Sequence, residues 1–291
     1  MKAIRAIALY LLAVIVLGAL LAPWLFAAVQ ATGNDWLVRQ PFKRVFSRAL
    51  LIVALIGLWP LLRGVGYTSW GQVGYRRVPG WWHQLGWGFG LGLLSLAVAV
   101  ALSIGVGHRS LAPLPGLMGT LSLLGKLLLT AGLVAVIEET LFRGGLQGAL
   151  QRGMPWLVAV VVASAIYSVV HFLKSKDADI ARDAVVWSSG FTYLGRVLTR
   201  SFAHPNFAVG FTSLFLAGGI LGWAYTKTGT LYLSIGLHAG WVLANEFVRE
   251  LRGGKIIEDW LTWPALLALG VLIAWLCRRR SSWRSAFSRC D

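Results

Sequence analysis

The sequence predicts an all-α fold, a polytopic membrane helix bundle with about eight transmembrane helices, and three observations carry that prediction. First, 57% of the 291 residues are hydrophobic. Second, only 13% are charged, against the ~25% that is usual in soluble domains. Third, the apolar residues gather in runs long enough to span a bilayer, which takes ~20 residues of helix. A soluble globular enzyme is therefore excluded.

Eight apolar runs, separated at clusters of charged residues, glycine and proline, are predicted to span the membrane. Lipid offers the backbone no hydrogen-bond partners, so each run must satisfy its own amides as a helix. The runs also lack the alternation of polar and apolar residues that a membrane β-barrel needs. The predicted spans are residues 4–29, 45–62, 86–107, 121–141, 155–173, 206–225, 229–249 and 259–277.

Two connections between these runs are expected to lie along the membrane surface. Residues 63–84 mix arginine with tryptophan and tyrosine, a composition that suits the headgroup region. The longest connection, residues 174–205, contains a stretch from 185 to 198 that is expected to form a short amphipathic or re-entrant element. The first run ends like a cleaved signal sequence, but its length favours a retained anchor.

The chain carries a net charge of +16, and its basic residues lie between and beside the apolar runs. In that position they determine topology, so membrane lipid is the expected partner and nucleic acid is not. Both termini are basic, and an even number of spans places them on one side. We expect a multi-pass protein of the cell membrane with both termini in the cytoplasm. The two cysteines, Cys277 and Cys290, offer no disulfide framework and no cysteine metal site.

The domain organisation predicted from the sequence is simple. No internal repeat and no shift in composition marks a second domain. We therefore expect one polytopic domain over residues 1–291, with N-terminal anchor helices in residues 1–107 and a basic C-terminal tail in residues 278–291. The core that carries the motifs is expected at about residues 120–250.

Ionisable residues inside the spans are informative, because a charge at that depth costs about 2.5 to 3.5 kcal/mol. The fourth span ends in the sequence EETLFR, residues 138–143. Helical spacing lets Glu139 and Arg143 form a structural ion pair on one face. Glu138 lies about 100° round the helix, which makes it the candidate general base or acid. A purely structural role for both glutamates stays open on the sequence.

Two further spans each contribute a histidine. Tyr167 precedes His171 by one helical turn, so its ring can pack against the imidazole or fix its tilt. His238 lies beside small residues that let another helix approach closely. Asn245 returns to roughly the same face, and Trp241 either lines a cavity near His238 or packs in the core. A carboxylate and two histidines on three spans form a candidate site.

Three motifs follow one another on successive spans: Glu-Glu-x-x-x-Arg, aromatic-x-x-x-His and His-x-x-x-(Asn or a hydrophobic residue). In this order they resemble the CAAX prenyl protease and bacteriocin-processing family. These are glutamic-type intramembrane proteases related to type II CAAX endoproteases. The resemblance covers about residues 120–250. It implies an eight-helix bundle with a conical cavity open toward the cytoplasm, and an endopeptidase that acts on a membrane-associated protein or peptide.

The resemblance also implies a role for each matching residue. Glu138 and His171 together activate a water molecule. Glu139 and Arg143 form a structural pair. His238 stabilises the oxyanion of the tetrahedral intermediate.

Two positions depart from the family pattern. Tyr167 stands where phenylalanine is usual, which is a conservative change. Val242 stands where CAAX-type members carry an asparagine oxyanion donor, and one such donor can be worth roughly 2.7 to 4 kcal/mol. Asn245 is a candidate replacement if the helix is rotated or locally unwound.

Three other functions stay open on the sequence. The least supported is a small-solute transporter, because the chain has no repeated half. A zinc protease would use Glu138, His171 and His238 as ligands around an open site, although the chain has no H-E-x-x-H motif. A non-catalytic membrane protein of bacteriocin self-immunity type would keep the motifs without turnover. The leading hypothesis requires no metal or cofactor. Its expected substrate is a hydrophobic or membrane-anchored protein or peptide.

Overall fold

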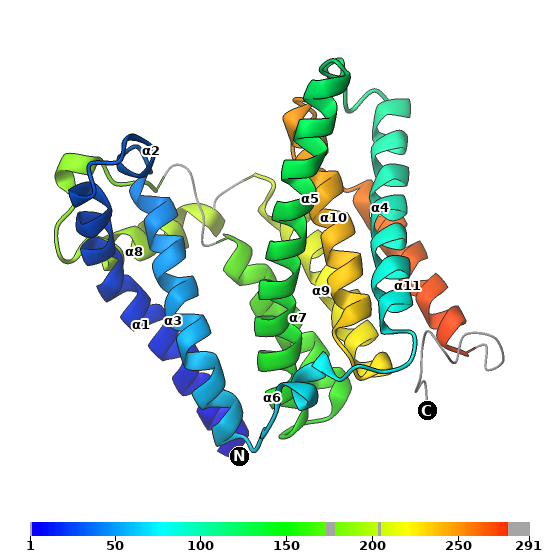
Figure 1. Cartoon of the computed structure of the whole chain (residues 1–291), viewed down its shortest axis with the longest axis horizontal. Helices are drawn as coiled ribbons and strands as arrows, with labels where there is room; N and C mark the ends of the chain where they lie inside the picture. Colours follow the sequence, from blue (N-terminus) through cyan, green and yellow to red (C-terminus); the bar gives the residue numbers. More distant parts are fainter. Residues whose placement is uncertain (1, 173–177, 203–204, 279–291) are drawn as a thin grey trace. The chain divides into compact units, whose positions relative to one another are not determined.

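The structure, a computed structural model, describes residues 2–172, 178–202 and 205–278. Within these ranges every regular element is a helix and no strand is present, which confirms the predicted all-α fold. Figure 1 shows the helices in the order of the chain. The predicted basic tail lies outside the described residues, except for its first residue.

Among the described residues, five helical stretches are long and apolar enough to cross a membrane, which confirms a multi-pass membrane protein. They are α1 (Lys2–Ala31), α3 (Phe42–Gly64), α4 (Trp81–Gly105), the stretch Leu117–Gln151 and α9 (Phe207–Thr228). The other predicted spans are occupied by α7 (Trp156–Phe172), α10 (Tyr232–Glu250) and α11 (Thr262–Arg278). All eight predicted runs are therefore helical, and eight crossings stay a prediction.

The connections between these helices contain shorter elements. The shortest are α2 (Asp35–Val38), η1 (Gly71–Tyr75), η3 (Arg182–Ala184) and η4 (Ile256–Glu258). The longest connection contains α8 (Ser189–Phe202), close to the position at which the sequence predicts a short amphipathic element. Tyr193 and Val197 of α8 are buried and four residues apart, which is the spacing of one face of an amphipathic helix.

The chain packs as two compact units. The anchor unit consists of Met1–Gly66 and Ser168–Phe207, and the motif unit consists of Tyr67–Tyr167 and Ala208–Asp291. Helix α7 passes from the motif unit into the anchor unit after Tyr167. The expectation of one domain over the whole chain stays a prediction.

In the anchor unit, α8 packs against α1 (Figure 1), and α1 contains a proline, Pro23. Pro23 has no N–H, so the carbonyl of Ala19 lacks its usual helical donor. Gly190, at the start of α8, packs so closely on this carbonyl that a Cβ there would clash with it. Aromatic residues of α3 and α8 fill the core of this unit, and the rings of Phe46 and Tyr193 lie 4.7 Å apart.

In the motif unit, α4 and α10 pack together through glycine. A Cβ on Gly88 of α4 would lie 2.5 Å from the carbonyl oxygen of Leu233. A Cβ on Gly240 of α10 would lie 2.5 Å from the carbonyl oxygen of Phe89. Glycine is required at both positions because the two backbones touch. The close helix approach predicted beside His238 is therefore present.

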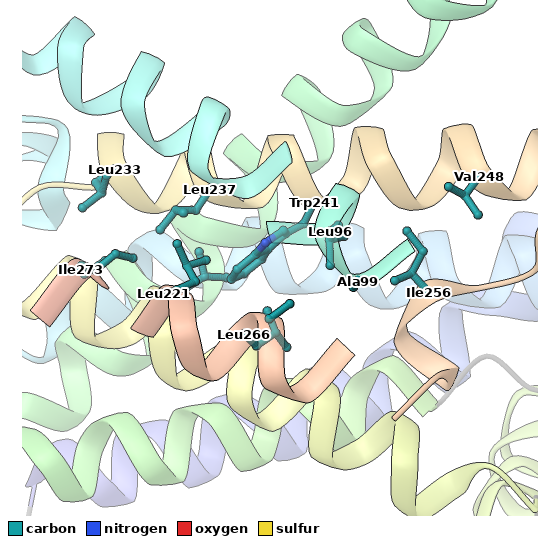
Figure 2. Packing of buried hydrophobic residues seen from close by; sticks show 13 residues of the cluster. Leu96, Ala99, Leu221, Leu233, Leu237, Trp241, Val248, Ile256, Leu266 and Ile273 are labelled. Carbon is teal, nitrogen blue, oxygen red and sulfur yellow. The ribbon is translucent and has the colours of Figure 1, made fainter. Parts of the chain in front are cut away.

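The main core of the motif unit joins α4, α9, α10 and α11 (Figure 2). Trp241 lies in this core and is 7% exposed, with Leu221 and Leu266 in the same cluster. Its indole N–H donates to Oγ of Ser95 at 2.9 Å. Of the two roles predicted for Trp241, core packing is the one that the structure shows.

Candidate active site

The first motif lies where α5 (Leu117–Glu139) changes into a wider π-helix, η2 (Thr140–Gln147). The N–H of Gly148 donates to the carbonyl of Arg143, five residues earlier. A Cβ on Gly144 would lie 2.5 Å from the side chain of a valine in η1, so glycine permits this close approach. A π-helical turn inside an α-helix is frequently found at a functional site. The sequence reasoning expected a regular helix here.

The ion pair predicted between Glu139 and Arg143 is present. Nη1 of Arg143 lies 3.0 Å from Oε1 of Glu139, and the two side chains are 2% and 0% exposed. Nη2 of Arg143 also donates to the carbonyl of Gly218 at 3.3 Å. Each charge is buried beside an opposite charge, which offsets the cost of removing both from water.

His238 hydrogen-bonds to the same carboxylate. Its Nδ1 lies 2.8 Å from Oε1 of Glu139. Oε1 of Glu139 already accepts a hydrogen bond from Arg143, so we infer that it also accepts from Nδ1 and that Nδ1 carries the hydrogen. Glu139 therefore fixes the orientation of the imidazole and directs Nε2 away from itself.

The other imidazole nitrogen faces Glu138. Oε2 of Glu138 lies 3.7 Å from Nε2 of His238, and the Glu138 side chain is 20% exposed while that of His238 is 5% exposed. Because successive residues are rotated by about 100° on a helix, the two glutamates reach different nitrogens of one ring. The imidazole of His238 thus lies between two carboxylates. We call Glu138, Glu139, Arg143 and His238 the site cluster.

Tyr167 packs against the site cluster from α7. Its ring meets that of His238 edge to face, with centroids 6.3 Å apart. The guanidinium carbon of Arg143 lies 4.6 Å from the centre of the Tyr167 ring, a cation–π contact. The ring of Phe142 also meets the Tyr167 ring edge to face, with centroids 5.1 Å apart. The aromatic residue of the second motif therefore orders the residues of the first and third.

His171 lies one turn after Tyr167, in the last turn of α7. It belongs to the anchor unit, whereas Glu138 and His238 belong to the motif unit. Its predicted place beside Glu138 stays a prediction. Within residues 2–172, 178–202 and 205–278, no group of three His, Cys, Asp or Glu side chains that could hold a metal ion is present. The zinc ligand set named from the sequence combines residues of both units and stays a prediction.

Asn245 and Val242, the two positions of α10 considered for an oxyanion donor, both contact other parts of the motif unit. Oδ1 of Asn245 accepts the N–H of Ile256 at 3.1 Å and so joins the end of α10 to η4. Asn245 lies seven residues, or ~10 Å of helix, from His238. Val242 packs against an apolar cluster that includes Leu127. A role for Asn245 in holding an oxyanion stays a prediction that these contacts do not favour.

Sequence reasoning missed two features of the site. One is the second role of Glu139, whose carboxylate bonds both Arg143 and His238. The other is a hydrogen bond between the hydroxyls of Tyr75 and Thr140, which joins η1 to the start of η2. Thr140 follows the two glutamates directly, but nothing in the sequence pairs it with a tyrosine 65 residues earlier.

Comparison with known proteins identifies the motif-bearing segment. Residues 120–244 match the model of the family described as Type II CAAX prenyl endopeptidase Rce1-like. The match contains the site cluster, Tyr167 and His171, and it ends one residue before Asn245. The predicted resemblance is thereby confirmed over this segment. A search of curated proteins gave no match to the chain.

Proposed function

We propose that this protein is an intramembrane endopeptidase that hydrolyses a peptide bond with a water molecule activated by Glu138. One observation carries the proposal: the imidazole of His238 is held between the carboxylates of Glu138 and Glu139. The similarity of residues 120–244 to a family of prenyl endopeptidases supports it. Ionisable groups gathered inside a membrane bundle are functional candidates.

The site cluster divides its acidic residues into two roles. Arg143 is bonded to Glu139, and both side chains are inaccessible, so Glu139 acts as the positioning residue for His238. Glu138 is the more accessible carboxylate, and it faces the nitrogen that Glu139 leaves available. A proton can therefore pass between Glu138 and His238 without disturbing the ion pair beside them.

The proposed reaction balances with these residues alone. Glu138 takes a proton from water as the water oxygen forms a bond to the carbonyl carbon of the substrate. In this step His238 acts as the imidazolium, with its Nδ1–H on Glu139 and its Nε2–H donating to the oxyanion that develops on the carbonyl oxygen. The C–N bond then breaks, and the proton on Glu138 passes to the leaving amine. The family resemblance adds His171 as a second residue that orients the water.

The substrate in this proposal is a hydrophobic or membrane-anchored protein or peptide. Val242 provides no hydrogen-bond donor at the position where CAAX-type members carry asparagine, so His238 is the donor that α10 supplies. We do not tie the activity to a prenylated cysteine for that reason. The proposed location is the cell membrane, with both termini in the cytoplasm.

The proposal is tested by comparing protein termini in cells that express the wild type or Glu138→Gln, in both membranes and medium. The substitution keeps the shape of the side chain and removes the base. A matched control is Glu246→Gln, because Glu246 lies on α10, pairs with Arg249 and is 22% exposed, close to the 20% of Glu138. We expect new termini with the wild type and Glu246→Gln that are missing with Glu138→Gln.

A different result redirects the assignment. If all three proteins accumulate equally and yield the same termini, the peptidase proposal is wrong, and a binding role of self-immunity type takes its place. Once a substrate is known, the zinc alternative is tested on purified protein treated with a strong chelator. We expect full activity after chelation, since the proposed chemistry uses no metal. Loss of activity that added zinc restores would support the zinc protease.

A further inference from the structure

The anchor unit contains a groove between α1 and the segment that leads into α8. Its volume is about 300 Å³, at the lower end of the range for ligand sites. One wall comes from the part of α1 around Pro23, and the other from η3 and the residues that follow it. The main lining residues are Pro23, Trp24, Phe26, Arg182, Val186 and Trp187.

The position of the groove along α1 places it near the membrane surface. Trp24 lies seven residues before the end of α1 at Ala31, which is ~10 Å of helix. Trp24 and Trp187 are 68% and 69% exposed. Exposed tryptophans at this depth are typical of the boundary between hydrocarbon and headgroups. The groove is therefore open at the level where lipid phosphates meet acyl chains.

Arg182 gives the groove its charge. It is the charged residue of the lining, and within the described residues no ion pair of Arg182 is present. The nearby acidic residue Asp179 pairs with Lys43 instead. Nζ of Lys43 lies 3.5 Å from Oδ2 of Asp179, and the backbone N–H of Lys43 donates to Oδ1 at 2.9 Å. Asp183 follows Arg182 but does not line the groove. An apolar groove with an exposed guanidinium is complementary to an anionic amphiphile.

We propose that this groove binds one anionic phospholipid, with its phosphate on Arg182 and an acyl chain along the tryptophans. Guanidinium groups pair well with phosphate, because their donors match its oxygens. One arginine at the edge of an otherwise apolar groove favours a lipid whose headgroup has a net negative charge over a zwitterionic one. The bound lipid would bridge α1 and the start of α8, and so stabilise the anchor unit.

Native mass spectrometry of the full-length protein in detergent tests this proposal. Phosphatidylglycerol and phosphatidylcholine with identical acyl chains are added separately to the wild type, Arg182→Ala and Arg200→Ala. Arg200 is the matched control, since it is an exposed arginine of α8 that does not line the groove. We expect the wild type to retain one tightly bound phosphatidylglycerol. We expect Arg182→Ala to weaken that binding about fivefold, and Arg200→Ala to leave it unchanged.

Two further variants test the charge and the apolar wall of the groove separately. Arg182→Lys retains the charge and should bind more tightly than Arg182→Ala. Trp187→Ala removes part of the apolar wall and should weaken retention of both lipids equally. Arg182→Ala should weaken retention of phosphatidylglycerol more than that of phosphatidylcholine, whose choline offsets the phosphate charge. The proposal is overturned if the wild type binds the two lipids equally, or if Arg182→Ala and Arg200→Ala give the same affinity. A melting temperature for each variant identifies any that fails to fold, and the remaining substitutions then decide.

Discussion

Two polar clusters of the motif unit are built from similar side chains but differ in how their carboxylates are bonded. The loop cluster consists of Ser103 at the end of α4, Arg109 in the following loop and Asp259 before α11. Asp259 accepts hydrogen bonds from the Ser103 hydroxyl, the Leu261 N–H and Arg109, so its acceptors are well supplied. In the site cluster, one oxygen of Glu139 accepts from two donors.

The two clusters also differ in the second oxygen of the carboxylate, which among the described residues accepts a hydrogen bond in Asp259 but not in Glu139. In the part of the chain that the structure describes, Oε2 of Glu139 is buried and has no hydrogen-bond partner. Buried acceptors are normally satisfied, so an exception calls for an explanation. In the loop cluster the groups serve to hold an anion in place. In the site cluster an imidazole lies between two acids, an arrangement that can move a proton and that costs stability.

The largest effect on activity is expected at Glu138, the accessible carboxylate of the site cluster. Glu138→Gln should lower activity about 10²- to 10⁴-fold, the usual contribution of a general base, while the melting temperature stays near that of the wild type. Activity is measured as initial rate on the substrate identified from protein termini. Glu246→Gln should keep the wild-type rate. Equal rates for the two variants would mean that Glu138 is not the base.

The second prediction concerns the buried ion pair. Arg143→Met should destabilise the protein by about 3 to 5 kcal/mol, because it leaves the charge of Glu139 buried beside an apolar side chain. The measurement is the melting temperature or denaturant midpoint in detergent. The double variant Glu139→Gln with Arg143→Met removes both charges and should recover most of that stability.

The double variant also separates structure from chemistry. If Glu139 positions His238, the double variant should remain poorly active although it is stable. If Glu139 and Arg143 are only structural, as the sequence and the family resemblance suggest, activity should return along with stability. The second result would contradict the role that we give to the contact between Glu139 and His238.

Much of the fold was predictable because it depends on local properties. Run length and the backbone's need for internal hydrogen bonds placed helices at all eight predicted ranges. The pair Glu139–Arg143 followed from a spacing of four on one helix. Glu138 was singled out because it could not share that face.

The rest depends on how helices rotate and pack, which one sequence does not encode locally. The contact between Glu139 and His238 joins residues 99 apart. The apolar pattern around Trp241 fits both core packing and lining of a cavity. The rotation of α10, which the sequence does not give, places Trp241 in the core. The π-helix at Thr140–Gln147 follows the two glutamates directly and widens the helical turn there. Its Gly144 packs closely against η1, and the sequence does not show which segment that glycine would meet.

A smaller effect is expected from His238. His238→Gln should lower kcat about 10²- to 10³-fold, the usual contribution of one oxyanion donor, and should change KM little, because the interaction forms in the transition state. Steady-state kinetics on purified protein provide the measurement. His108→Gln is the control, since His108 is exposed in the loop after α4. A change confined to KM would assign His238 to substrate binding instead.

The smallest effect should come from the loop cluster. Asp259→Asn should leave activity unchanged and lower stability by about 1 kcal/mol, since the amide carries no charge and has one acceptor oxygen where the carboxylate has two. Burial alone would raise the pKa of Asp259, but the Ser103 hydroxyl, the Leu261 N–H and Arg109 together hold this pKa below its ordinary value.

The sign of the pH dependence follows from that lowered pKa. Because Asp259 has a lower pKa in the folded than in the unfolded protein, its stabilisation is complete above the unfolded value of about 3.9 and is lost as the pH falls through the folded value. The difference in melting temperature between the wild type and Asp259→Asn should therefore be constant from pH 7 to 5 and shrink below pH 4. A difference that grows in acid would mean that Asp259 is held in its protonated form, and the contrast between an anion fixed in the loop cluster and a proton exchanged in the site cluster would fail.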